Sequence, residues 1–297
     1  MNVLKVNNLD FNYGKFQALK DISFEVSNGV VGILGPNGAG KSTTIKLITT
    51  LFDIQKGDIF LNNLDYKKDL KEIRKKMGYL PQEFSVYGNL KGREFLEIIA
   101  SLKLKYDKQE ISKHIDKIIN ELDMSAYIDK KIKQYSGGMK QKLGFAQVII
   151  GNPSLIVVDE PTVGLDPEQR NYIRELLPII SKDRIVLITT HIVEDIEYYC
   201  DYLLVIKEGR LIYKGTKENF INEIDGMLWE ADVAPEMFNK ISSNSKIILN
   251  QRKDNFAHVK YISKTPLTDN SQKITPNLQE AYIAYNKIND NKNDNYD

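Results

Sequence analysis

The chain has 297 residues, 42% hydrophobic and 27% charged, an ordinary globular composition with room for one large domain and a small one. Its 41 Lys and Arg against 40 Asp and Glu leave a net charge of +1, which gives no global electrostatic reason to expect nucleic-acid binding. No apolar run approaches about 18 residues, the start shows no signal-peptide pattern, and Cys200 is the single cysteine. We therefore expect no transmembrane helix, no internal disulfide and a reducing compartment.

Residues 1–28 are predicted to form antiparallel strands. Ile22, Phe24 and Val26 alternate with polar residues, as on a half-buried sheet. Tyr13 lies between two strand candidates. A tyrosine there commonly just packs, but it is also suited to stack on an adenine ring, because aromatic side chains stack on any nucleobase.

The next stretch predicts a phosphate-binding loop between a strand and a helix. Residues 30–34 form an apolar run typical of a buried strand, and apolar residues recur at helical spacing in 45–52. The loop between them has the spacing G-x-x-x-x-G-K-[ST] and consists of Gly35, Pro36, Asn37, Gly38, Ala39, Gly40, Lys41, Ser42 and Thr43. Its glycines let backbone N–H groups turn toward one anion, and the following helix directs its positive end there. We expect Lys41 to reach the β- and γ-phosphates and Ser42 to hold Mg²⁺.

A mostly helical insert is expected at about 83–152. Before it, residues 57–61 and 77–80 are predicted strands, the second ending at Pro81-Gln82, and 68–76 form a basic helix whose charges suit a solvated face. Apolar residues recur at helical spacing within 95–102 and 111–122. The insert holds Tyr135-Ser136-Gly137-Gly138-Met139, and Ser136-Gly137-Gly138 lies at a predicted helix start, which is an anion-binding position.

Two further apolar runs end in polar residues. Residues 155–158 lead into Asp159-Glu160, and 185–188 lead into Thr189-Thr190-His191. Continuous apolar strands that alternate with helices indicate a parallel sheet covered on both faces. The predicted fold class is therefore α/β, a P-loop NTPase with a mostly parallel core sheet and an antiparallel β subdomain. Because ligands bind at the carboxyl ends of such strands, the loop, Asp159, Glu160 and His191 are expected to form one site.

The C-terminal part is predicted to be a small α+β appendage. Residues 227–233 and 247–250 are possible strands, the latter pairing with 256–262, and 278–285 form a closing helix. The expected domains are 1–216, 217–288 as an accessory domain, and a disordered tail at 289–297.

Together these motifs resemble the ATP-binding subunit of an ABC transporter, over about residues 1–216. The motifs of this family occur here in the expected order. They are the stacking aromatic at Tyr13, the Walker A loop at Gly35 to Thr43, the Q-loop at Gln82, the signature at Tyr135 to Met139, the Walker B strand and glutamate at Leu155 to Glu160, the D-loop at Gly164 to Asp166 and the switch histidine at His191. A histidine at a strand end is more often structural, but its position relative to the other motifs favours a functional role here.

The resemblance implies a site with two cofactors, ATP and Mg²⁺. It assigns catalysis to Lys41, Gln82, Glu160 and His191; Mg²⁺ to Ser42, Gln82 and Asp159; and ATP contacts to Tyr13, the loop Gly35–Thr43, Ser136, Gly137, Gly138 and Asp166. The chemistry agrees, since Asp159 can hold Mg²⁺ through its water shell while Glu160 polarises the attacking water.

In the family the signature binds the γ-phosphate held by the opposite subunit. One loop and one signature in this chain therefore imply a dimer with a second copy or a paralogue. Two residues depart from the usual Leu-Ser-Gly-Gly-Gln: Tyr135 replaces Leu and Met139 replaces Gln. Without the glutamine we expect no inter-subunit side-chain hydrogen bond from position 139, while the anion-contacting Ser and both Gly remain.

The expected function is ATP hydrolysis coupled to a separate membrane permease, held near residues 83–92, by a cytoplasmic subunit on the inner face of the cell membrane. The segment Thr275–Glu280 resembles the closing Pro-x-Leu-Glu of ATPases that serve drug, peptide, polysaccharide and sodium exporters, so export is preferred to import. The alternative is an ABC ATPase not coupled to transport, such as an iron–sulfur assembly type. The sequence gives no indication of the cargo.

Overall fold

The computed structural model describes residues 1–252 and 256–293, and the chain divides into two compact units between Lys214 and Gly215. The sequence places this boundary at residue 216. The core of the first unit is a six-stranded sheet in the order β10-β9-β3-β8-β7-β6. Its strands are β3 (Gly29–Leu34), β6 (Met77–Leu80), β7 (Leu155–Asp159), β8 (Ile185–Thr190), β9 (Tyr202–Lys207) and β10 (Arg210–Thr216).

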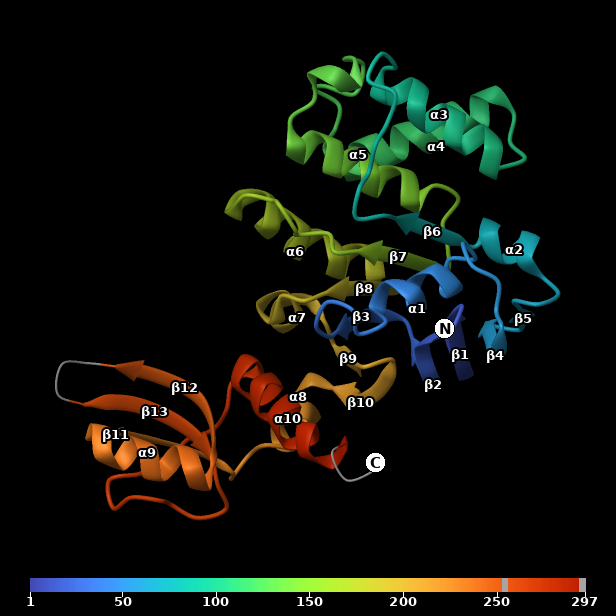
Figure 1. The fold of residues 1–297 in the computed structure, drawn as a ribbon. Helices are drawn as coiled ribbons and strands as arrows, with labels where there is room; N and C mark the ends of the chain where they lie inside the picture. The colour runs from blue at the N-terminus through green and yellow to red at the C-terminus, as the bar shows by residue number, and fades with distance from the viewer. Residues whose placement is uncertain (253–255, 294–297) are drawn as a thin grey trace. The chain divides into compact units, whose positions relative to one another are not determined.

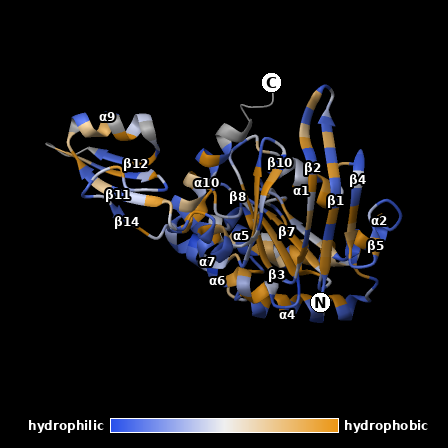
Figure 2. Cartoon of the chain, turned by 90° about the horizontal axis from the view of Figure 1, so that it is seen from below, coloured by the Kyte–Doolittle hydropathy of each residue, from blue (hydrophilic) through white to orange (hydrophobic). Residues whose placement is uncertain are grey.

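The strands from β9 to β6 pair in parallel, as the sequence predicts for this α/β fold. Strand β8 is buried along its whole length, and Figure 2 shows the strongly hydrophobic centre of the sheet. A strand buried on both faces has no reason to alternate polar and apolar residues. The continuous apolar runs of the sequence therefore mark these strands.

Helices cover both faces of the core sheet (Figure 1). Helix α1 (Lys41–Ile48) packs on the side of Val31 and Ile33, with which its own isoleucines and leucine share one hydrophobic cluster. The opposite side of β3 takes α7 (Val193–Tyr199), and α6 (Pro167–Ser181) also lies along the sheet. A Cβ at Gly32 would lie 2.2 Å from Ile196 Cδ1 and 2.8 Å from Cys200 Sγ, so the helix approaches β3 too closely for any side chain. Cys200 therefore packs in the core.

A second, antiparallel sheet covers the outer side of α1. Its order is β2-β1-β4-β5, from β1 (Val3–Tyr13), β2 (Phe16–Ser27), β4 (Lys56–Leu61) and β5 (Leu64–Asp65). Leu4 and Val6 of β1 join the cluster that holds Ile45 and Leu47 of α1. This confirms the antiparallel subdomain and fixes α1 between two sheets. The short α2 (Leu70–Lys75) follows β5.

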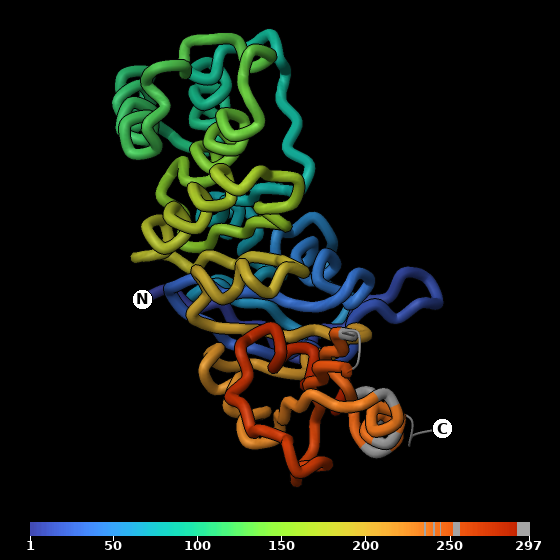
Figure 3. The backbone as a smooth tube through the Cα atoms, turned by 90° about the vertical axis from the view of Figure 1, so that its left-hand side faces the viewer, coloured from blue at the N-terminus to red at the C-terminus, as the bar shows by residue number. Residues whose placement is uncertain are grey.

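The helical insert consists of α3 (Gly92–Lys103), α4 (Lys108–Glu121), a short 3₁₀ turn η1 (Ile132–Gln134) and α5 (Gly137–Ile149). Asp107 caps α4 by accepting hydrogen bonds from Gln109 N and Glu110 N, as a capping box does. Helix α5 rests on β6, where a Cβ at Gly78 would lie 2.1 Å from Val148 O. Figure 3 shows the insert at one end of the first unit, beyond β6.

The second unit is α+β. Its elements are α8 (Lys217–Asn222), β11 (Leu228–Val233), α9 (Pro235–Asn244), β12 (Lys246–Arg252), β13 (Ala257–Ile262), β14 (Gln272–Lys273) and α10 (Leu278–Asn293). The sheet order is β12-β13-β11-β14, with antiparallel pairs. The sequence indicates three of the strands and α10 but neither α8 nor α9. Helix α10 continues into the segment 289–297 expected to be disordered; residues 294–297 lie outside the described part.

Asn277 begins α10 as a cap. Its Oδ1 accepts from Glu280 N at 2.8 Å, and Glu280 Oε2 accepts from Asn277 N at 3.0 Å, while Pro276 and Leu278 are buried. The Pro-x-Leu-x-Glu spacing therefore builds a buried anchor followed by a capping box. Among the described helices, none combines the length and the hydropathy needed to cross a membrane.

Candidate functional site

The glycine-rich loop joins β3 to α1 through two left-handed residues. Gly38 has φ 80° and Gly40 has φ 108°, a region that side chains rarely adopt. Gly40 also has no room for a side chain, because a Cβ would lie 2.8 Å from Leu19 Cδ2 and 3.1 Å from Ala18 O. The loop therefore turns tightly enough to leave the first N–H groups of α1 open to an anion.

Lys41 folds back over this loop. Its Nζ donates to Gly35 O at 2.7 Å and to Pro36 O at 3.1 Å, and the residue is buried. Burial lowers the pKa of Lys41, and the carboxylates of Glu160 and Asp159 oppose that shift. Two carbonyl acceptors are weak partners for an ammonium group, so phosphate oxygens would be stronger ones.

A cavity of about 530 Å³ opens above the loop. It is lined by Tyr13, Phe16, Ala18, Asn37, Gly38, Ala39, Gly40, Lys41, Ser42, Thr43, Gln82, Glu160, Val163 and His191. Its wall includes Tyr13, which is 44% exposed and whose Oη lies 3.3 Å from Thr43 Oγ1. The structure thus brings most of the sequence-predicted residues into one place, and adds Phe16, Ala18 and Val163, for which no motif gives a signal.

Glu160 is the centre of the polar side of this cavity. Its Oε1 lies 3.2 Å from His191 Nδ1, and its Oε2 accepts from Gln82 Nε2 at 3.4 Å. The Glu160 side chain is 12% exposed, against 43% for His191. A nearly buried carboxylate is thus held from two sides by residues of two other segments, with the imidazole nearer to solvent.

Asp159 lies at the end of β7, outside the residues that line the cavity. Burial raises the pKa of this carboxyl, and a hydrogen bond from Thr189 acts in the other direction. Thr189 Oγ1 donates to Asp159 Oδ1, while Glu160 N donates to Thr189 Oγ1 and to Thr189 O, both at 3.1 Å. Sequence reasoning missed Thr189; its only signal is its place at the end of β8, level with Asp159.

The oxygen atoms near the loop fit a hard divalent cation. Ser42 supplies a hydroxyl, Gln82 an amide and Asp159 a carboxylate, which are groups that suit Mg²⁺. Within residues 1–252 and 256–293, no group of three or more His, Cys, Asp or Glu side chains is arranged to hold a metal. A Mg²⁺ ion that binds together with a nucleotide is held mainly by phosphates and water, with few protein ligands.

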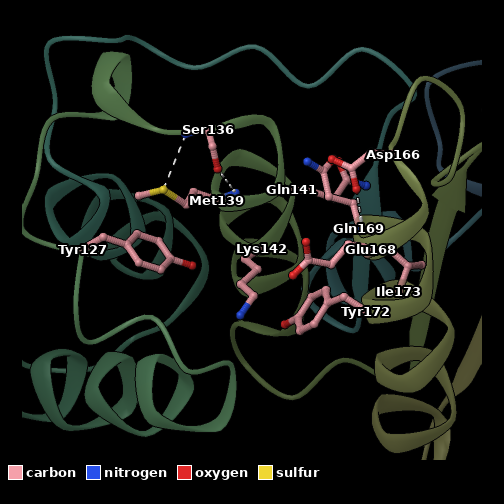
Figure 4. A pocket seen from close by; sticks show the side chains of 11 residues that line it. Tyr127, Ser136, Met139, Gln141, Lys142, Asp166, Glu168, Gln169, Tyr172 and Ile173 are labelled. Carbon is pink, nitrogen blue, oxygen red and sulfur yellow. Dashed lines mark hydrogen bonds between the residues drawn. The ribbon is translucent and has the colours of Figure 1, made fainter.

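Ser136, Gly138 and Asp166 line a different cavity, of about 340 Å³ (Figure 4). The other residues around it are Tyr127, Met139, Gln141, Lys142, Glu168, Gln169, Tyr172 and Ile173. Ser136 caps α5 and Asp166 caps α6, where its Oδ1 accepts from Gln169 N at 2.8 Å. Gly137 lies between two of the lining residues, and a Cβ there would lie 3.7 Å from Gln169 Oε1. Within one copy, the Ser-Gly-Gly segment and the glycine-rich loop therefore lie in separate cavities.

Tyr135 is a core residue. It is 6% exposed, its Oη donates to the carbonyls of Tyr127 and Ile128 at 3.2 Å each, and its ring meets the Tyr127 ring edge-on. Met139 instead completes the α5 cap weakly, with Ser136 N 3.5 Å from its sulfur. Tyr135, the first departure from the usual signature, is thus accommodated as a packed core residue. Met139, the second departure, alters the cap at the start of α5.

A buried ion pair joins the turn after Glu160 to two helices. Asp195 of α7 is fully buried and accepts from Thr162 Oγ1 and, at 3.1 Å, from Arg174 of α6. The Arg174 guanidinium also lies over the Tyr198 ring, 4.0 Å from its centre. Since Thr162 follows Glu160 in the same turn, this cluster fixes the chain between β7 and α6.

Comparison with known proteins places these features in one family. Residues 19–163 match the family model described as ABC transporter. The linearmycin resistance ATP-binding protein LnrL of Bacillus subtilis is 33% identical over 226 residues, covering 75% of this chain and 72% of the relative. A solved ATP-binding subunit of an ABC transporter superposes with a TM-score of 0.67 at 29% identity, covering 74% of this chain and 92% of that one. The ADP conformation of another ABC transporter cassette superposes with a TM-score of 0.66 at 26% identity, covering 75% of this chain and 94% of that one.

Proposed function

The chain belongs to the ATP-binding subunits of ABC transporters and is an ATPase, and on that premise we propose that it drives an exporter by hydrolysing ATP at a site completed by a second cassette. The observation that carries the chemical part is the Glu160 carboxylate, held between His191 and Gln82 at the edge of the cavity above the phosphate-binding loop.

Glu160 acts as the general base. Its carboxylate polarises the attacking water, and His191 and Gln82 restrict its direction, so that the water is aimed at the γ-phosphate. His191 reaches Glu160 through Nδ1, which leaves Nε2 for the phosphate. Phosphoryl transfer requires mainly positioning and charge neutralisation, and one base with one buried cation meets that requirement.

Lys41 and the loop amides bind the phosphates. On ATP binding, Lys41 Nζ exchanges its two loop carbonyls for β- and γ-phosphate oxygens. Ser42, Gln82 and Asp159 would hold Mg²⁺, which neutralises charge on the phosphates when bound. Tyr13, half exposed at the cavity wall, offers its ring to the adenine.

The second cavity supplies the other half of the site. Ser136, Gly137 and Gly138 begin α5, so their amides and the Ser136 hydroxyl can accept a γ-phosphate presented by another copy or by a paralogue. Asp166 starts α6 at the opposite wall. The separation of the two motifs within one chain supports a head-to-tail dimer.

Export through a separate permease is supported by the second unit and by one relative. The Pro-x-Leu-x-Glu spacing before α10 forms an anchor and cap, and the name of the Bacillus relative records resistance to linearmycin, which an exporter can confer. We place the permease contact at residues 83–92, on the inner face of the cell membrane. Co-expression with a candidate membrane permease tests the coupling: the ATPase should co-fractionate with membranes. If it stays in the soluble fraction, an ATPase not coupled to transport, such as an iron–sulfur assembly type, becomes the better reading.

A further inference from the structure

The backbone at Glu160 leaves the β-strand in an unusual conformation. Successive residues of a strand point to opposite faces, so a regular β7 would send Asp159 and Glu160 to opposite sides of the sheet. Glu160 instead has φ 46°, a left-handed value that few residues other than glycine adopt and that has an energetic cost. Such a conformation persists only where the surroundings hold it.

Thr189 is the residue that holds this turn. It is fully buried at the end of β8 and pairs with Asp159 in the parallel ladder. The Glu160 N–H donates to both oxygens of Thr189, its carbonyl and its hydroxyl, each at 3.1 Å. The left-handed residue therefore keeps its amide satisfied even though it has left the regular strand.

The same hydroxyl also fixes the neighbouring carboxylate. A threonine hydroxyl has one proton to donate, and Thr189 donates it to Asp159 Oδ1. Its acceptor side is taken by Glu160 N. One side chain thus sets the direction of Asp159 and the backbone conformation of Glu160.

We propose that Thr189 is a positioning residue for ATP hydrolysis. Its hydroxyl aligns Asp159 for the Mg²⁺ shell by donating to Asp159 Oδ1, and aligns Glu160 for the attacking water by accepting from Glu160 N. The inference rests on the roles proposed above for those two carboxylates. Thr189 itself lies among buried residues and does not line the cavity, so it acts only through them.

The test separates the hydroxyl from the shape of the side chain. T189V keeps the branched shape and loses the hydroxyl, T189A loses both the hydroxyl and the methyl group, and T189S keeps the hydroxyl. T49V is a matched control, because Thr49 is buried and its hydroxyl donates to the carbonyls of Ile45 and Lys46 in α1. Melting temperatures without nucleotide report the structural cost of each change.

We expect T189V and T189A to lower kcat about 10- to 100-fold with little change in KM for ATP, as loss of a residue behind a metal ligand commonly does. T189S should restore most of the activity, and T49V should retain all of it. Wild-type kcat in T189A, or a T189S variant as slow as T189A, would overturn the proposal.

Two further readouts distinguish this inference from the proposed function. In an E160Q background at saturating Mg²⁺, T189A should cause no additional loss of residual hydrolysis. It should still raise, about 10-fold, the Mg²⁺ concentration needed for tight binding of a fluorescent ATP analogue. An unchanged Mg²⁺ requirement overturns the role of Thr189 toward Asp159. If E160Q itself hydrolyses ATP normally, the assignment of Glu160 fails; if E160Q is inactive and T189A is normal, only the Thr189 proposal fails.

Discussion

His191 Nδ1 lies 3.2 Å from Oε1 of Glu160, and this contact joins the end of β8 to the end of β7 at the mouth of the nucleotide cavity. The imidazole is 43% exposed and the carboxylate side chain only 12% exposed. The histidine therefore shields the carboxylate from solvent on one side while remaining accessible to a ligand on its other nitrogen.

Replacing this histidine should damage turnover more than binding. We expect H191A to lower kcat about 100-fold with a small change in KM for ATP, because it removes the group that orients Glu160 and leaves the phosphate-binding loop intact. Steady-state ATPase kinetics measure the split. H258A is the control: His258 also contacts a carboxylate, with its Nδ1 2.8 Å from Asp232 Oδ1, but it lies in the second unit. Equal losses in the two variants would contradict the assignment.

The buried ion pair behind the turn is expected to be a stability element. D195N keeps the size of the side chain but leaves Arg174 and Thr162 without their charged acceptor, at a cost of about 3 kcal/mol. Chemical denaturation of the variant against D183N, a change at an exposed carboxylate, measures the difference. If D195N were as stable as D183N, the ion pair of Asp195 with Arg174 would not contribute to the free energy of unfolding.

Met139 occupies the third position of α5, where a capping box usually has Glu or Gln. Its sulfur is a weak acceptor, 3.5 Å from Ser136 N, so M139Q should stabilise the start of α5 by about 0.5–1 kcal/mol. M139L is the control that removes the acceptor without adding an amide. The ATPase rate of M139Q should be no lower than that of the wild type, and thermal unfolding should place its transition above that of M139L. The reverse order of transitions would contradict this account of the cap.

Lys103 should make stability depend on pH. Burial lowers its pKa to about 8, and its Nζ donates to Met77 O at 3.0 Å. Because the folded pKa lies below the unfolded value near 10.4, the unfolded chain binds more protons between these pH values, and the wild type gains stability as pH rises from 8 to 10. The free energy of unfolding of the wild type relative to K103M should therefore increase over this range. A difference between the wild type and K103M that stays flat over this range would contradict this role of Lys103.

The core and most of the nucleotide cavity could be predicted because the signals are local. Strand β3, the glycine-rich loop and α1 are consecutive, so the sequence shows their order without any knowledge of distant contacts. Asp159 and His191 follow buried apolar strands, and parallel strands place their carboxyl ends together. The apolar runs were long enough to distinguish these strands from exposed ones.

What could not be predicted depends on contacts between distant segments. The role of Thr189 requires the register of β7 against β8, which leaves no motif. The Tyr135 hydroxyl donates to the carbonyls of residues 127 and 128, and the position of these carbonyls is defined only once the helical insert is packed. Helices α8 and α9 are short, so their helical form depends on the elements they pack against, which are α10 for α8 and strands β12 and β13 for α9.

The most direct test of the account is the E160Q variant, assayed for hydrolysis and for self-association with Mg-ATP. Glutamine keeps the size of the side chain but cannot act as a base, so hydrolysis should fall by about 100-fold or more while the phosphate-binding loop stays intact. Sedimentation should then show an ATP-dependent dimer that persists, because the two half-sites close on ATP and cannot release it. E160Q that hydrolyses ATP at the wild-type rate would contradict the claim that Glu160 is the base. E160Q that forms no dimer with saturating Mg-ATP, either alone or mixed with a paralogous ATP-binding subunit, would contradict the claim that the site is shared by two cassettes.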